Sequence, residues 1–207
     1  MNKLLQRSAE YEKLVTGMLS FPPYEHSARS RVSRIMCSVS LEHAESTKML
    51  LAAGNFTSAL GLLRLQYEAL VRAIWIYYAA SEMVVEKLSS DLSVESAKKA
   101  EKLPMLSEML QKMHGKVPKN ALDPLLEFRE YSWKPLSSYI HGGIHAIDRH
   151  YKGYPIHIVK QALKASNGVS GMTGYFVAVQ SGNSELTKEF HKSFYDYQDC
   201  LPDHKVK

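Results

Sequence analysis

The chain has 207 residues, of which 45% are hydrophobic and 23% are charged, and its formal net charge is +5. These values are typical of a globular protein with an apolar core, and they exclude a disordered chain or one dominated by a polybasic segment. We therefore expect a single domain that spans residues 1–207.

Cysteine content and hydropathy exclude further classes of protein. Cys37 and Cys200 are the only cysteines, too few for a disulfide framework or a cysteine-based zinc site. The longest apolar run, residues 73–80, is far shorter than the roughly twenty residues that a membrane-spanning helix needs. The first residues turn polar at once, unlike a secretory signal. The expectation is a cytoplasmic protein with reduced thiols and no membrane partner.

The apolar residues of the first third follow helical periodicity, and no alternating strand pattern interrupts them. A first helix is predicted over residues 4–19, before Pro22 ends it. A second is predicted over residues 27–53, followed by Gly54, which suits the left-handed position after a helix. The third, over residues 57–80, is apolar almost all round, which indicates a central helix.

The middle of the chain is more polar, and residues 82–115 predict one or two short, exposed helices. Pro124 and Pro135 fit the first turn of two further helices, because a proline there removes no helical hydrogen bond. The second of these helices is predicted to continue to about Arg149, with His141 in its middle. The predicted fold class is all-α, a single antiparallel helical bundle.

Glycines recur near the C-terminal end. A helix is predicted to begin near Ile156, and a last one covers residues 184–200. Gly168, Gly171 and Gly174 lie at steps of three in the second half of the helix that begins near Ile156, without the preceding strand that a dinucleotide-binding loop requires. We interpret them as a thin helix face for tight packing, and the alternative is a flexible loop beside a site.

A polar stripe crosses the predicted central helix. Arg64, Glu68 and Arg72 lie four residues apart and therefore share one face. Because the rest of that helix is apolar, the stripe must lie in the core or line a cleft, where an unpaired charge costs several kcal/mol. Glu68 can neutralise the charge of one arginine, so a phosphate or another carboxylate must neutralise the charge of the other. The alternative is a structural network completed by carboxylates of neighbouring helices: Glu42, Glu45 or Asp148.

A second group of polar residues surrounds His141. His145 follows four residues later, which would place both imidazoles on one helix face, and Ser138 and Tyr139 lie on the turn before. The two glycines that follow His141 would each cost about 1 kcal/mol inside a helix, which indicates a close approach by a helix, a ligand or a partner chain. The alternative is an ordinary hydrogen-bonded core histidine.

A metal site is less well supported. His141 and His145 could share an ion, but neither a His-Glu-x-x-His nor a Glu-x-x-His motif supplies further ligands. We therefore predict no metal ion and no cofactor.

Two segments carry a resemblance to a known group of proteins. Residues 63–75, LRLQYEALVRAIW, and residues 139–143, YIHGG, resemble helical bacterial proteins similar to the HEPN (higher eukaryotes and prokaryotes nucleotide-binding) superfamily. The resemblance covers roughly residues 30–180. It implies an antiparallel helical bundle, often dimeric, that is associated with RNA cleavage, nucleotide binding or phage defence.

The sequence departs from the HEPN nuclease signature, which has an arginine four to six residues before a histidine on one helix. No arginine occupies that interval before His141, and Lys134, seven residues earlier, stands directly before Pro135. Either Arg64 or Arg72 therefore supplies the missing group from another helix, or the protein is not a nuclease.

The functional hypothesis is an RNA- or nucleotide-directed protein that acts as a metal-independent ribonuclease. His141 is the expected general acid or base, since histidine titrates near neutral pH, and Arg64 and Arg72 are expected to hold the phosphate. The other residues assigned to substrate binding are Glu68, Tyr139, Ser138, Lys134 and His145.

The competing hypothesis is a non-catalytic accessory module, similar to an antitoxin, with a purely structural arginine–glutamate network. The sequence leaves open whether the protein is an enzyme. The expected partners are RNA or a nucleotide, a second copy of the chain, and, for an accessory module, another protein.

Overall fold

The structure is a computed structural model that describes residues 1–100 and 103–203. Every regular element in that range is helical, as the sequence predicts, so the protein is all-α. The elements are α1 (Asn2–Gly17), η1 (Met18–Ser20), α2 (Ala28–Ala52), α3 (Phe56–Tyr78), α4 (Glu82–Ser89), α5 (Val94–Ala100), α6 (Leu106–Met113), α7 (Lys119–Ile140), α8 (Ile144–Lys152), α9 (Ile156–Gln180), α10 (Ser184–Asp196) and η2 (Gln198–Cys200).

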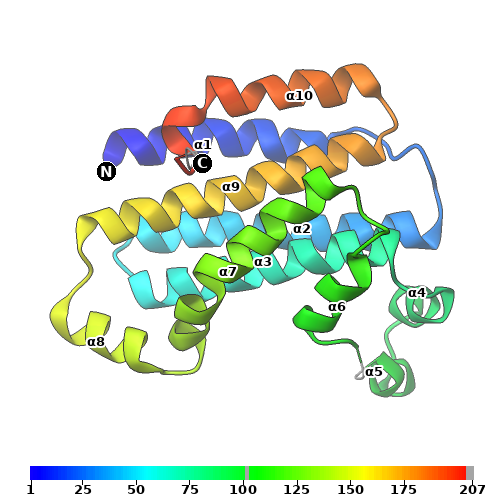
Figure 1. The fold of residues 1–207 in the computed structure, drawn as a ribbon, viewed down its shortest axis with the longest axis horizontal. Helices are drawn as coiled ribbons and strands as arrows, with labels where there is room; N and C mark the ends of the chain where they lie inside the picture. Colours follow the sequence, from blue (N-terminus) through cyan, green and yellow to red (C-terminus); the bar gives the residue numbers. More distant parts are fainter. Residues whose placement is uncertain (101–102, 204–207) are drawn as a thin grey trace.

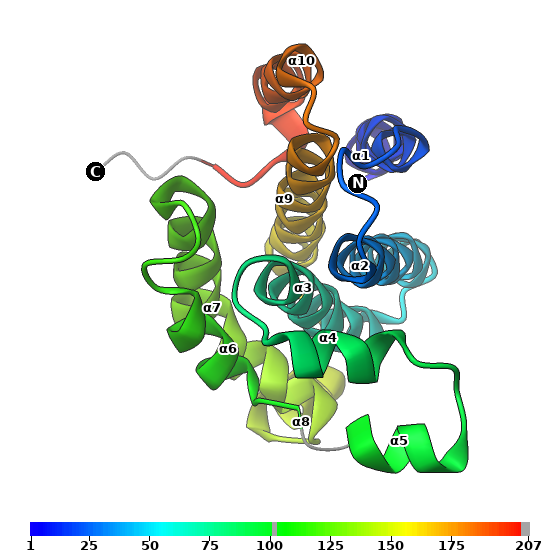
Figure 2. The ribbon, with the colours of Figure 1, turned by 90° about the vertical axis from the view of Figure 1, so that its right-hand side faces the viewer.

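The long helices α1, α2, α3, α9 and α10 lie roughly along one direction, whereas α7 crosses them obliquely (Figure 1). Seen along that direction, α9 lies between α1 and α10 on one side and α2 and α3 on the other (Figure 2). Helix α8 lies at one end of this arrangement and α4 and α5 lie at the other. In the described ranges, no helix is both long and apolar enough to cross a membrane.

Helices α2 and α3 form an antiparallel pair whose ends the sequence predicts well. The Ser27 side chain accepts a hydrogen bond from the Ser30 N–H and caps α2. Gly54 adopts a φ of 82°, the left-handed value expected after a helix. Helix α3 contacts α2, α6, α7 and α9, so its central position is confirmed.

Helix α7 contradicts two predicted boundaries. It continues from Lys119 to Ile140 with Pro124 and Pro135 in its interior, so neither proline begins a helix. A proline inside a helix costs about 3 kcal/mol. Buried Leu125 and Leu136, each just beyond one of the prolines, pack in the core that includes α3 and offset that cost. Before α7, the described residues 82–100 and 103–115 form three helices, not one or two.

A layer of buried polar side chains joins α2, α3 and α9. Gln66 is fully buried, and its Nε2 donates to the Ser166 carbonyl at 2.9 Å and to Ser170 Oγ at 3.1 Å. Its Oε1 accepts from Ser166 Oγ at 2.7 Å, and its carbonyl accepts from Ser40 Oγ at 2.9 Å. Since a buried polar group without a partner is costly, these bonds fix how far each helix is shifted along its neighbours.

The α9 glycines provide close packing, as predicted. A Cβ at Gly168 would lie 2.8 Å from Pro202 Cγ, and one at Gly174 would lie 2.5 Å from Phe190 Cζ. A Cβ at Gly171 would collide with the side chains of Tyr11 and Phe194. The stripe therefore lets α1 and α10 approach α9 closely.

The Gly174→Ala variant is expected to lower the free energy of unfolding by about 1–3 kcal/mol, because the added methyl group overpacks a filled site. Phe190 is only 3% exposed and has little room to move. The matched control is Gly17→Ala, because a Cβ at Gly17 meets nothing within 4 Å. Urea unfolding measures both, and equal stability of the two variants would contradict the packing role.

Candidate functional site

A polar contact between α3 and the end of α7 forms the centre of the candidate site. Arg64 Nη1 lies 3.1 Å from His141 Nε2. A guanidinium can only donate, so Nε2 is the acceptor and the proton of the neutral imidazole lies on Nδ1. His141 is exposed, whereas the Arg64 side chain is 14% exposed. The imidazole is thus open to solvent, and the guanidinium is held within the protein.

Two neighbours position the Arg64 guanidinium. Its Nε lies 2.8 Å from Glu68 Oε1, one turn along α3. Its Cζ lies 4.2 Å from the centre of the Trp133 ring of α7, a cation–π contact. The C-terminal end of α7, which carries partial negative charge, lies close by at His141. Groups within the protein therefore compensate the positive charge of Arg64.

His141 does not lie in the middle of a helix, so that prediction is wrong. It is the C-cap residue of α7, and Gly142 follows with a left-handed φ of 64°. The Gly143 N–H donates to the Ser138 carbonyl at 2.8 Å, which completes a Schellman motif. The glycines therefore end one helix and turn the chain into α8. His145 lies beyond this turn, so the two histidines share no helix face.

The remaining predicted residues lie around this turn. Ser138 Oγ accepts from the His145 N–H at 3.0 Å and so holds the first turn of α8. Tyr139 packs beside His145 with ring centres 6.4 Å apart, and burial raises the pKa of Tyr139, which keeps its hydroxyl a donor. Lys134 is exposed on α7, two helical turns before His141.

Arg72 is the one predicted catalytic residue that the structure leaves apart. It lies eight residues beyond Arg64 on α3, or about 12 Å along the helix axis. Within the described part of the chain, no hydrogen bond or ion pair joins Arg72 to Glu68 or His141. The pair of arginines therefore does not converge on one atom, and Arg64 alone meets the histidine.

The predicted structural network also has different members. Asp148 pairs with Lys152 inside α8, and Glu42 and Glu45 are exposed on α2. Trp133, which covers the Arg64 guanidinium, is not among the residues predicted from the sequence. No spacing within α3 or α7 indicates this pairing, because it depends on how the two helices cross.

Candidate positions for other ligands are limited. Among the described residues, no three or more His, Cys, Asp or Glu side chains are grouped to hold a metal ion. A hollow of about 580 Å³ lies against α8. Its lining residues are Thr57, Ala146, Ile147, His150 and Tyr151.

The Arg64–His141 pair combines the groups that phosphate chemistry uses. The guanidinium can bind phosphate oxygens and stabilise charge that develops on them. The imidazole offers one nitrogen that accepts a proton and one that donates, as general acid–base catalysis requires. An exposed histidine held against a fixed arginine is therefore suited to a phosphodiester.

Comparison of the chain with curated proteins and with solved structures found no match. A family model described as a family of unknown function (DUF6988) matches residues 37–203. The matched range includes both Arg64 and His141. The chain therefore belongs to this family of unknown function.

Proposed function

We propose that the protein is an HEPN-like antiparallel helical bundle that binds RNA and cleaves it without a metal ion. The observation that carries the proposal is the 3.1 Å contact between Arg64 and the exposed His141. The chain lacks an arginine shortly before His141 on the same helix. Arg64 supplies that group from α3, which is one of the two alternatives that the sequence leaves open.

In the proposed reaction, a phosphate oxygen of RNA replaces His141 Nε2 as the acceptor of the Arg64 N–H. The freed Nε2 removes the proton of the adjacent 2′-hydroxyl, and the 2′-oxygen attacks the phosphorus. The bond from phosphorus to the 5′-oxygen breaks, and that oxygen takes a proton from a water molecule, which recovers a proton from the His141 imidazolium. Arg64 stabilises the charge on the phosphate during the exchange. The products are a 2′,3′-cyclic phosphate and a 5′-hydroxyl.

The surrounding residues have supporting roles in this proposal. Glu68 orients the Arg64 guanidinium, and the Tyr139 hydroxyl donates to the substrate. Lys134 and His145 are exposed near the turn and attract the RNA backbone. Ser138 holds the turn that places them.

The proposal extends to a cytoplasmic homodimer that acts in bacterial stress or phage defence, as the HEPN resemblance implies. An exposed apolar face of α8 supports an interface. Ile144, Ile147 and Tyr151 lie on that face and are 77%, 66% and 87% exposed. Light scattering of the purified protein measures whether two copies associate.

The test is incubation of the purified protein with RNA in EDTA. Cleavage is expected, with fragments that carry 2′,3′-cyclic phosphate and 5′-hydroxyl ends by mass spectrometry. The His141→Ala protein, purified in the same way, detects contaminating nucleases. The His114→Ala variant is the matched control, because His114 is also an exposed C-cap residue, at the end of α6. Equal cleavage by the native and His141→Ala proteins, or none by either, contradicts the proposal.

A second candidate is a non-catalytic interaction module that binds a partner protein. The specific observation in its favour is the confinement of Arg64, whose guanidinium is held by Glu68 and Trp133. Removing one partner of a fully buried ion pair costs roughly 3–5 kcal/mol, which is the upper limit for this partly buried pair, so this candidate expects Arg64→Ala to destabilise the protein strongly. The proposed nuclease expects a folded variant that no longer acts on RNA.

A further inference from the structure

A second hollow lies at the start of α2. It has a volume of about 450 Å³, within the range of small-molecule sites. One wall is a face of α2 that carries Arg31, Arg34 and Ser38, and the other is the segment between α1 and α2. The apolar side chains in its lining are Leu19, Pro23 and Ile35.

Arg34 is the most informative residue of this hollow. Its Nη2 donates to the carbonyls of Leu19 at 3.1 Å and Phe21 at 2.7 Å, which fixes the opposite wall. Its Nη1 is buried and has no hydrogen-bond partner in the part of the chain that the structure describes. Partial burial also lowers the pKa of Arg34, because it disfavours the charged form. The two carbonyls are neutral, and no ion pair of the described residues includes Arg34, so its positive charge has no carboxylate partner there.

The charges that line the hollow favour an anion. Arg31 and Arg34 are cationic, and His26 adds an imidazole. Glu25 is the only carboxylate of the lining. Arg31 is exposed, and no ion pair of the described residues includes it. At least one positive charge is therefore left over. A phosphate ester carries nearly two negative charges at neutral pH, and arginine binds it through paired hydrogen bonds.

The hollow is held in shape before any ligand arrives. The Tyr24 N–H donates to the Gln180 carbonyl at 2.9 Å, which ties the loop to the end of α9. Arg34 ties the same loop to α2. Preformed walls lower the cost of ordering a site around a ligand.

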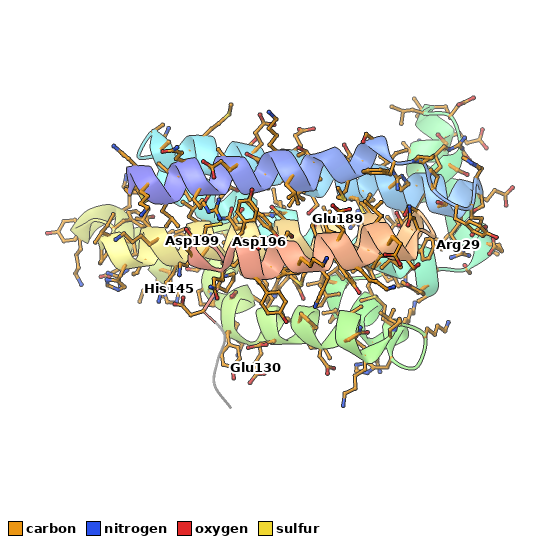
Figure 3. The ribbon with its side chains drawn as sticks, turned by 90° about the horizontal axis from the view of Figure 1, so that it is seen from above. Arg29, Glu130, His145, Glu189, Asp196 and Asp199 are labelled. Atoms are coloured by element: carbon orange, nitrogen blue, oxygen red, sulfur yellow. The ribbon has the colours of Figure 1, made fainter. Side chains whose placement is uncertain are left out.

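This hollow is separate from the Arg64–His141 pair. Arg29, on the same turn of α2 as the hollow, donates to the Ile76 carbonyl, and Ile76 lies about 18 Å along α3 from Arg64. Figure 3 shows Arg29 at one end of the long helices and His145 toward the other. The hollow and the Arg64–His141 pair are therefore two separate sites.

We propose that the hollow at the start of α2 binds a small phosphorylated organic compound. Arg31 binds the phosphate, Arg34 adds its positive charge from the same wall, and the wall of Leu19, Pro23 and Ile35 contacts the organic part. This site is independent of RNA cleavage by His141.

The experiment is titration of the full chain with inorganic phosphate, AMP and adenosine at constant ionic strength. Calorimetry gives the affinity, and backbone amide NMR shifts locate the bound ligand. Inorganic phosphate and AMP are both expected to shift the amide signals of Ser27, Arg31 and Ser38. AMP is expected to bind more tightly than phosphate, and adenosine is expected not to bind. The His141→Ala variant is expected to bind equally well, so failure of the nuclease proposal leaves this result unaffected.

Two substitutions are expected to change the Kd for AMP in opposite directions. Arg31→Gln is expected to raise Kd for AMP about 10- to 100-fold, the value of a charge-assisted hydrogen bond. Glu25→Gln is expected to lower Kd, because it removes the only repulsive charge of the lining. The control Lys192→Gln, an exposed change on α10, is expected to leave Kd unchanged. No saturation below about 10 mM AMP, shifts confined to the α7–α8 turn, or equal affinity of the Arg31→Gln and Lys192→Gln variants overturns the proposal.

Discussion

The His141→Ala variant is expected to cleave RNA about 10²- to 10⁴-fold more slowly than the native protein, the usual contribution of a general acid–base residue. The imidazole is exposed at the end of α7, so its removal opens no cavity in the core. The free energy of unfolding is expected to change by less than about 1 kcal/mol, as for most exposed substitutions. Initial cleavage rates and urea unfolding measure the two quantities.

The Arg64→Ala variant completes this prediction. Arg64 is expected to contribute about 10²- to 10³-fold to the rate, as a group that stabilises developing charge. Because Arg64 and His141 are in direct contact, the double variant is expected to lose little more than the more impaired single variant. If the rate loss of the double variant equalled the product of the two single losses, the two residues would act independently.

Arg64→Lys separates the catalytic role from a structural one. A lysine can keep the ion pair with Glu68, but it lacks the planar fork that stacks on Trp133 and reaches His141. A folded protein with the slow rate of Arg64→Ala is the expected result. Full activity together with lost stability would assign Arg64 to the structure alone.

The Gln66→Leu variant is expected to lower the free energy of unfolding by roughly 3 kcal/mol. Leucine has a similar volume but leaves the Ser166 hydroxyl and carbonyl and the Ser170 hydroxyl without this partner in the core. Each unsatisfied buried group costs about 1–3 kcal/mol. For a chain of this length, the midpoint of thermal unfolding is then expected to fall by about 6–12 °C.

The double variant Gln66→Leu with Ser166→Ala is the control for this second prediction. It removes both side chains of the 2.7 Å hydrogen bond, and replacing both partners by apolar groups is much less costly than removing one. The double variant is therefore expected to be more stable than Gln66→Leu alone. If it were less stable, volume and not hydrogen bonding would explain the loss.

The helices with strong end signals could be predicted from the sequence. Ser27 and Gly54 mark the limits of α2 because each suits a specific backbone geometry at a helix end. The position of α3 follows from its nearly continuous apolar surface. These signals are local, so tertiary contacts do not change them.

The errors concern α7, where local and tertiary effects oppose each other. Pro124 and Pro135 are local signals for the start of a helix, yet packing on both sides of each one keeps a single helix continuous through both. The reverse holds at His141, where Gly142 is a typical helix end that sequence analysis placed within a helix. The rule that glycine follows a helix C-terminus would have located this end.

The candidate site was only half predictable for a related reason. Arg64 and His141 could be selected as polar residues in unusual surroundings, but 76 residues separate them in the sequence. Their meeting depends on the crossing of α3 and α7, which also brings Trp133 over the guanidinium. Neither the meeting of Arg64 with His141 nor the separation of Arg72 from it follows from periodicity.

The buried polar layer has a consequence for how heat affects the site. Gln66 lies two residues beyond Arg64, so its hydrogen bonds to α9 and the contact of the guanidinium with His141 lie within one turn of α3. Sliding by a single turn displaces a helix by about 5.4 Å, farther than a hydrogen bond can stretch. Interior substitutions in this layer should therefore produce temperature-sensitive proteins, which separate the guanidinium from the imidazole while far-ultraviolet circular dichroism still reports intact helices.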